Sequence, residues 1–307
     1  MSTTVTAPTR ADKVRHAKKN LDEHIKDLAE QMRQGKSEKL VHYLEFCSRF
    51  HTYSFGNMIL AMFQRSDISR LAGLRQWNKV GRHVRSGEKG IMILAPMTVQ
   101  KRPSGDPEEE SEATGEETRE ARETVRIFKP VYVFDVSQTE GAELPSLIHA
   151  SGDVTALLPA VREAIHRHGI TLDEVETIPL LPGALGVSRG GTIAVRRDLP
   201  EADLFRTLVH EFAHEMLHWQ NEEKPRERGR EARTLRETEA DAAAFVVCRH
   251  FSVECDTADY LLLYDSEAKT LLDRLETIRQ TAARIIEAVE QPLSVSVPSQ
   301  GVLAAAG

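Results

Sequence analysis

The sequence predicts an α+β protein of two domains. Its 307 residues suit two domains of ordinary size. Helical periodicity recurs along most of the chain, and two alternating, β-branched stretches flank an acidic segment near its middle. We expect an α+β domain with a β-hairpin over residues 1–145, a mainly helical domain over residues 146–290, and a disordered tail over residues 291–307.

In the N-terminal domain the sequence predicts four helices and then two strands. The helices are expected over residues 10–35, 36–50, 55–66 and 74–81. Gly87 and Gly90 mark a tight turn that leads into a strand over residues 91–100. A second strand, over residues 126–138, completes a long hairpin.

The segment that joins the two strands is strongly acidic. Residues 104–124 hold nine acidic residues against two arginines, a net charge of −7, and almost no apolar side chains. Such a composition is typical of a disordered loop. Residues 51–103 hold nine lysines and arginines against two acidic residues, so the overall net charge of −7 conceals a basic segment.

The C-terminal domain is expected to contain one strand among its helices. A turn at Gly190 and Gly191 precedes this strand, over residues 192–196. The predicted helices cover residues 153–169, 199–220 and 234–251, with two more between residues 258 and 291.

Composition indicates a cytoplasmic protein without a membrane anchor. The three cysteines form no CxxC pair, which excludes a disulfide framework and a thiolate zinc site and suits a reducing cytosol. The N-terminus lacks the apolar core of a secretory signal, and no apolar run approaches membrane-spanning length.

Residues 210–214, HEFAH, have the HExxH pattern of a catalytic zinc site. Residues four apart share a helix face, so His210 and His214 can bind one Zn²⁺ ion. Glu211 then lies beside the ion and can act as the catalytic base toward metal-bound water. A chance match on an amphipathic helix is the alternative. His218 continues the spacing and is expected in the core or in support of a ligand, rather than as a fourth ligand.

The acidic helix that follows offers the third ligand. Glu237 and Asp241 share a face, so Glu237 could bind the ion while Asp241 accepts a hydrogen bond from the far nitrogen of a ligand imidazole. Glu239 is the fallback ligand. The alanines at 242–244 are small enough to let this helix lie close to the HExxH helix.

These motifs resemble a known class of enzymes. The strand, LVHEFAHEMLHW, a charged loop and ETEADAAAFVVC resemble the gluzincin-type metallopeptidases of the ImmA/IrrE class, and also the C-terminal half of ArdC antirestriction proteins. The resemblance spans about residues 150–255. It implies that His210, His214 and Glu237 bind the metal and that Glu211 is the base.

The basic segment interleaves charged and flat side chains. A groove that follows phosphates and stacks bases needs this mixture, whereas a solvated face around a buried Trp77 is the alternative. The residues expected to bind DNA are Tyr53, Asn57, Arg75, Trp77, Lys79, Arg82, Arg85 and Lys89.

An ordered series of motifs resembles the N-terminal domain of ArdC proteins, a single-stranded DNA-binding module. The series is Y-S-x-x-N from Tyr53, Q-W from Gln76, G-x-x-V-R-x-G-E-K-G from Gly81 and V-F-x-V-x-Q-x-E-G from Val133. It covers about residues 10–145. The acidic segment departs from the family pattern, and by mimicking nucleic acid it could compete for the groove.

Together the halves imply an ArdC-like architecture. We expect a single-stranded DNA-binding protein with a zinc metallopeptidase domain, acting on a protein substrate and associated with antirestriction or mobile elements. One alternative is a DNA-binding antirestriction protein with a structural or inactive zinc site. Another is a DNA-directed protease in a stress or DNA-damage response.

Overall fold

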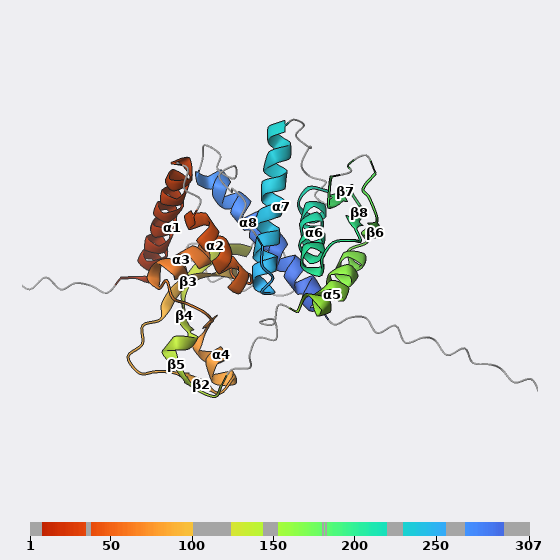
Figure 1. Ribbon diagram of the computed structural model, residues 1–307. Coiled ribbons are helices and arrows are strands. Elements are labelled where there is room, and N and C mark those ends of the chain that lie inside the picture. Colours follow the sequence, from red (N-terminus) through yellow and green to blue (C-terminus); the bar gives the residue numbers. More distant parts are fainter. Residues whose placement is uncertain are drawn as a thin grey trace, which may run out of the picture. The chain divides into compact units, whose positions relative to one another are not determined.

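The computed structural model (Figure 1) describes residues 8–34, 38–100, 124–143, 153–179, 181, 183–219, 230–255 and 268–291. The tail from residue 292, most of the acidic segment and the region of residues 256–267 lie outside these ranges. The chain divides into a first compact unit, Met1–Lys26 with Gly56–Leu144, and a second, Asp27–Phe55 with Pro145–Gly307. The domain boundaries expected from the sequence stay a prediction.

The predicted hairpin is the main sheet of the first unit. Strands β3 (Ile91–Gln100) and β4 (Thr124–Asp135) pair antiparallel from Ile91 opposite Val133 to Gln100 opposite Thr124. The short strand β1 (Leu71–Ala72) pairs with the other edge of β4. A second small sheet, which the sequence did not predict, pairs β2 (Arg82–Val84) with β5 (Thr139–Gly141).

Four helices occur where the N-terminal pattern predicts them. They are α1 (Arg10–Arg33), α2 (Glu38–Arg49), α3 (Phe55–Gln64) and α4 (Leu74–Lys79). Ala17 of α1, Leu60 of α3 and Leu94 of β3 are buried together in the core of the first unit. The Asn57 side chain hydrogen-bonds both backbone groups of Leu94, each at 2.9 Å, which ties α3 to β3.

Asp135 fixes the end of β4. Its buried carboxylate accepts hydrogen bonds from the backbone N–H groups of Ser69 (2.7 Å), Arg70 (2.9 Å) and Ser137 (2.9 Å). The Gln138 side chain accepts from Asp135 N at 2.9 Å and completes a capping box for the 3₁₀ helix η1 (Val136–Gln138). Burial opposes the charge, but the hydrogen bonds prevail and lower the pKa of Asp135.

The second unit is largely helical. Besides α2 it contains α5 (Val154–Arg167), α6 (Glu201–His214), α7 (Arg230–His250) and α8 (Ala268–Glu290). Its sheet has the order β6 (Thr171–Val175), β8 (Thr192–Arg196), β7 (Gly186–Ser188), with β6 parallel and β7 antiparallel to β8. The predicted strand is therefore central. The sequence did not predict its partners, because β7 is only three residues long and β6 (TLDEV) is more polar than β8.

The helix expected over residues 199–220 changes its winding. Its α-helical part ends at His214, and Glu215–Trp219 continues as the π-helical turn η3. Such turns widen the helix locally and often occur at functional sites. Leu204, Phe205, Leu208, Val209 and Phe212 are buried along one face of α6, as a 3.6-residue period requires.

Among the described residues the fold is mixed α+β, with small sheets and a helical second unit, as the sequence predicts. No described helix has both the length and the apolar character needed to cross a membrane.

Replacing Asp135 with alanine should destabilise the first unit by about 3 kcal/mol, because three backbone donors would lose a charged acceptor. The chain has two tryptophans, Trp77 in the first unit and Trp219 in the second. Urea unfolding followed by Trp77 fluorescence in a Trp219→Phe background therefore reports on the first unit. The exposed Asp67, which pairs with Arg65, is the control, and Asp67→Ala should leave the midpoint almost unchanged. Equal midpoints for the two variants would contradict the role of Asp135.

Candidate metal centre

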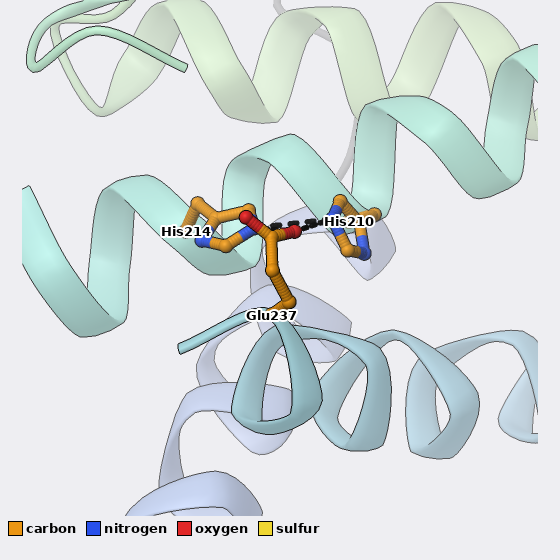
Figure 2. A group of neighbouring side chains, drawn as sticks. All are labelled: His210, His214 and Glu237. Atoms are coloured by element: carbon orange, nitrogen blue, oxygen red, sulfur yellow. Dashed lines mark hydrogen bonds and ion pairs between the residues drawn. The ribbon is translucent and has the colours of Figure 1, made fainter. Parts of the chain in front are cut away.

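Three side chains of types that bind metals meet between α6 and α7. Figure 2 shows the rings of His210 and His214 on successive turns of α6, with the Glu237 carboxylate extending toward both from α7. His214 Nε2 lies 3.1 Å from His210 Nε2 and 3.2 Å from Glu237 Oε2. His210 Nε2 lies 3.6 Å from the same carboxylate oxygen. These residues form a group that could hold a metal ion.

The three separations fit a single bound ion. Ligand atoms about 2.1 Å from a tetrahedral ion lie about 3.4 Å from one another, close to the 3.1–3.6 Å found here. Without a cation the group is held by its own charges. Burial opposes protonation of His210, but hydrogen bonds with Asp241 and Glu237 raise its pKa to about 10, and the two histidines lower the pKa of Glu237. A bound cation would replace the His210 proton.

Asp241 contacts one of the candidate ligands. Its Oδ1 lies 2.8 Å from His210 Nδ1, so the ring can donate its Nδ1 proton there and direct Nε2 to the centre. Glu239 faces elsewhere: it accepts a hydrogen bond from Arg274 at 3.0 Å and lies 3.8 Å from His218 Nε2. Among the described residues, therefore, the geometry favours Glu237 over Glu239 as the third ligand.

His218 lies next to the centre but outside the ligand group. Its Nε2 is 3.2 Å from the backbone oxygen of Arg236. Burial lowers the pKa of His218 to about 4, so the ring is neutral and donates to that oxygen. This contact ties the π-helical turn to α7.

Glu211 lies on the adjoining face of α6, against β7. It is 7% exposed, and burial raises the pKa of its carboxyl group, while the backbone N–H of Ser188 donates a hydrogen bond to it. A methyl group on Gly186 would come within 2.9 Å of Glu211 Cγ and 2.7 Å of Thr207 Cγ2. Gly186 is thus required for β7 to pass so close to the carboxylate.

A pair of glycines fastens β7 and β8 to the end of the HExxH helix. Gly190 and Gly191 both have positive φ angles, and their N–H groups donate to the buried Glu215 carboxylate at 2.8 Å each. Trp219 donates to Ser188 Oγ at 3.3 Å and lies over Gly190, where a Cβ would be 2.5 Å from the indole. The sequence predicts the glycine turn but does not reveal its acidic partner, Glu215.

A cavity of about 960 Å³ lies over the three ligands. Strand β7 and Glu211 form one side, and residues of α7, among them Arg236 and Phe245, contribute to the rest of its lining. The ligand group therefore borders a space large enough for a substrate segment.

The structure assigns folding roles to several residues expected to bind DNA. Trp77 is 4% exposed and donates its indole N–H to Phe134 O at 2.9 Å, so its ring presents no face for base stacking. Arg82 donates to Thr139 Oγ1 and O, at 2.8 and 3.0 Å, and to Ala142 O at 2.6 Å. These contacts hold β2 against β5.

The other residues expected to bind DNA lie in both units. Arg85 donates to Ser137 O at 2.6 Å and pairs with Glu88 at 2.8 Å. Tyr53 belongs to the second unit and packs edge-on against Phe50. Of the residues expected to bind DNA, those with exposed side chains in the first unit are Arg75, Lys79, Arg85 and Lys89.

Comparison with known proteins identifies the architecture. Residues 14–134 match the sequence profile of the N-terminal domain of anti-restriction factor ArdC. The Mn(II)-bound crystal structure of the antirestriction ArdC protein from plasmid R388 has the same fold, with a TM-score of 0.50 and 15% identity, over 89% of this chain and 99% of that one. The chain has an ArdC-like fold, and its N-terminal part matches the ArdC profile.

The metal-free form of the same R388 protein is less similar. The metal-free crystal structure of R388 ArdC aligns with a TM-score of 0.44 and 17% identity, over 77% of this chain and 84% of that one. No curated protein sequence matches the ArdC-like chain.

Alanine at His210, His214 or Glu237 should abolish stoichiometric metal binding by the ArdC-like chain. Glu211→Gln and Glu239→Ala should retain it, because neither side chain belongs to the ligand group. Asp241→Asn should weaken metal affinity about 10–100-fold by removing the acceptor behind His210. Calorimetric titration with Zn²⁺ and elemental analysis of the loaded proteins test these expectations. A full metal equivalent in Glu237→Ala, with loss in Glu239→Ala, would move the third ligand to Glu239.

Gly186→Ala should displace Glu211 and leave the metal ligands in place, because the three atoms nearest to the added methyl group belong to Glu211 and Thr207. We expect unchanged metal stoichiometry, with a Glu211 carboxyl pKa that differs from that of the wild type when followed by infrared titration. Gly183→Ala is the control, since nothing lies within 4 Å of a Cβ at that position. Loss of the metal in Gly186→Ala alone would show that the strand also shapes the ligand group.

Proposed function

We propose that this chain is an antirestriction protein that binds single-stranded DNA through its first unit and cleaves peptide bonds at a metal centre in its second. The observation that carries the peptidase proposal is the convergence of His210, His214 and Glu237 beside a buried Glu211 and a cavity. The ArdC profile match and the ArdC-like fold support the antirestriction role.

The donor set favours a divalent transition metal. Two imidazole nitrogens and one carboxylate oxygen suit Zn²⁺, which generally binds such sites more tightly than Mn²⁺. R388 ArdC holds Mn(II) in its crystal structure, and we propose that the corresponding site here accepts either ion, with Zn²⁺ preferred. Three protein ligands next to a cavity are typical of a catalytic centre, whereas structural zinc sites usually have four. This distinction favours a peptidase over a purely structural zinc site.

Each side chain has a separate task in this proposal. A bound divalent ion would supply Lewis-acid polarisation of a substrate carbonyl. Asp241 orients His210, while Glu211 accepts a proton from a water molecule in the cavity and later returns it to the leaving amine. The raised pKa of Glu211 suits the first step, because a carboxylate whose acid form has a higher pKa is the stronger base.

Strand β7 is the proposed binding site for an extended substrate. It pairs with β8 along one edge, and no strand of the described residues pairs with its other edge. Its residues Gly186, Val187 and Ser188 line the cavity. A peptide added to that edge would form backbone hydrogen bonds and run past Glu211. The central position of β8 assigns this role to β7 and not to Thr192–Arg196.

Glu211→Gln should lower the rate of peptide cleavage about 10²–10⁴-fold while retaining bound Zn²⁺, because it removes the proton acceptor and preserves the ligands. The test is cleavage of unfolded casein and of candidate restriction enzymes by the Zn²⁺-loaded chain, with and without single-stranded DNA. Glu163→Gln, a change on α5, serves as the control. Cleavage at the wild-type rate by Glu211→Gln would exclude this residue as the base.

The wild-type chain should bind single strands more tightly than duplex, with affinity that falls steeply with salt. Lys79→Gln and Lys89→Gln should each reduce the salt slope by about 0.7 if each lysine contacts one phosphate. Lys39→Gln is the control, because Lys39 belongs to the second unit and pairs with Asp27. Fluorescence anisotropy at several salt concentrations measures both quantities. Equal affinity for duplex, or binding that ignores salt, would contradict this part of the proposal.

A further inference from the structure

Two aromatic side chains are exposed on one face of β4. Phe128 is 43% exposed and Tyr132 is 46% exposed, whereas Trp77 is buried. Alternate residues of a strand face the same way, so these rings share a face and lie about 13 Å apart along the strand. Exposed rings at regular spacing on a strand offer flat apolar surface to a ligand.

Each ring lies under a lysine of α1. Lys13 Nζ is 5.6 Å from the centre of the Tyr132 ring and donates to the tyrosine hydroxyl at 3.2 Å. Lys18 Nζ is 5.3 Å from the centre of the Phe128 ring. The buried contact among Ala17, Leu60 and Leu94 holds α1 beside the hairpin, all within the first unit. We call Lys13, Lys18, Phe128 and Tyr132 the lysine–aromatic ledge.

Gly90 makes room for the ledge. A Cβ at this position would lie 2.9 Å from Tyr132 Cβ and 3.3 Å from its Cδ1. Tyr132 thus occupies the space that a side chain at position 90 would need. Gly90 is therefore a positioning residue for the tyrosine ring.

The chemistry of the ledge matches unpaired nucleotides. An aromatic ring stacks on any base whose face is free, and an ammonium group beside it meets the backbone phosphate. Bases in a duplex are already stacked, so they offer no face to either ring. The carboxylate of Asp12, next to Lys13, accepts hydrogen bonds from the backbone N–H and the hydroxyl of Thr9 and forms an ion pair with Arg15.

We propose that the lysine–aromatic ledge is the base-stacking site of the first unit, where single-stranded DNA places bases on Phe128 and Tyr132 and phosphates on Lys13 and Lys18. This inference rests on the proposed DNA binding and supplies the stacking residues in place of the buried Trp77. Each lysine shifts from its ring to a phosphate when a base takes its place over the ring.

Binding of a fluorescent oligothymidylate of about 15 nucleotides to the full-length chain tests the ledge. Phe128→Ala and Tyr132→Ala should each weaken binding about tenfold and leave the salt slope unchanged, because stacking releases no counterions. Tyr132→Phe should retain affinity. Lys13→Gln and Lys18→Gln should each reduce the slope by about 0.7. Leu74→Ala, at a 50% exposed apolar position of the same unit, should change neither quantity.

A crosslinking experiment avoids any effect of the substitutions on folding. An iododeoxyuridine oligonucleotide irradiated with the wild-type chain should attach to the peptide that carries Phe128 and Tyr132. Wild-type binding with crosslinks only elsewhere, or unchanged affinity in both alanine variants, would overturn the ledge and leave DNA binding intact. Failure of the wild-type chain to bind would overturn the proposed DNA binding and the ledge with it. Polyglutamate of equal charge is the competitor. If it displaced the oligonucleotide, and if Tyr132→Ala weakened its binding as much as that of DNA, the ledge would be assigned to acidic peptides instead.

Discussion

The close approach of α6 and α7 is the constraint on which the candidate metal centre depends. Two of its ligands lie on one helix and the third on the other, and metal–ligand distances tolerate deviations of only about 0.2 Å. Both helices carry small, fully buried side chains, Ala213 on α6 and Ala240 and Ala243 on α7, and small side chains suit close helix packing.

The geometry of α6 then separates the ligands from the proposed base. Successive residues on an α-helix point about 100° apart, so His210 and His214 face α7 while Glu211 faces β7. What holds β7 there is the Glu215 carboxylate, which fixes the Gly190–Gly191 turn. One helix thus organises both sides of the cavity, with its α-helical turns carrying the candidate ligands and Glu211 and its π-helical turn anchoring the sheet.

In the first unit, positive charge has two uses. Arg82 and Arg85 donate to backbone oxygens around β5 and η1 and help to close the small sheet. Lys79 and Lys89 remain exposed, and Lys13 and Lys18 lie over aromatic rings. Guanidinium groups suit the first use because their several donors reach several carbonyl groups at once. Ammonium groups on flexible stems suit the second use, the proposed binding of DNA, since they can move from an aromatic ring to a phosphate.

The sequence by itself determined the features that depend on local spacing. Periodicity located the helices and the hairpin, and the four-residue spacing of His210 and His214 and of Glu237 and Asp241 gave the pairs on each helix. The sequence did not decide between Glu237 and Glu239 as the third ligand, because that choice depends on which face of α7 meets α6. Only the tertiary structure decided that Glu239 pairs with Arg274, that Trp77 is buried, and that β7 lies beside Glu211. These outcomes depend on contacts between residues far apart in the chain, whose packing no local pattern encodes.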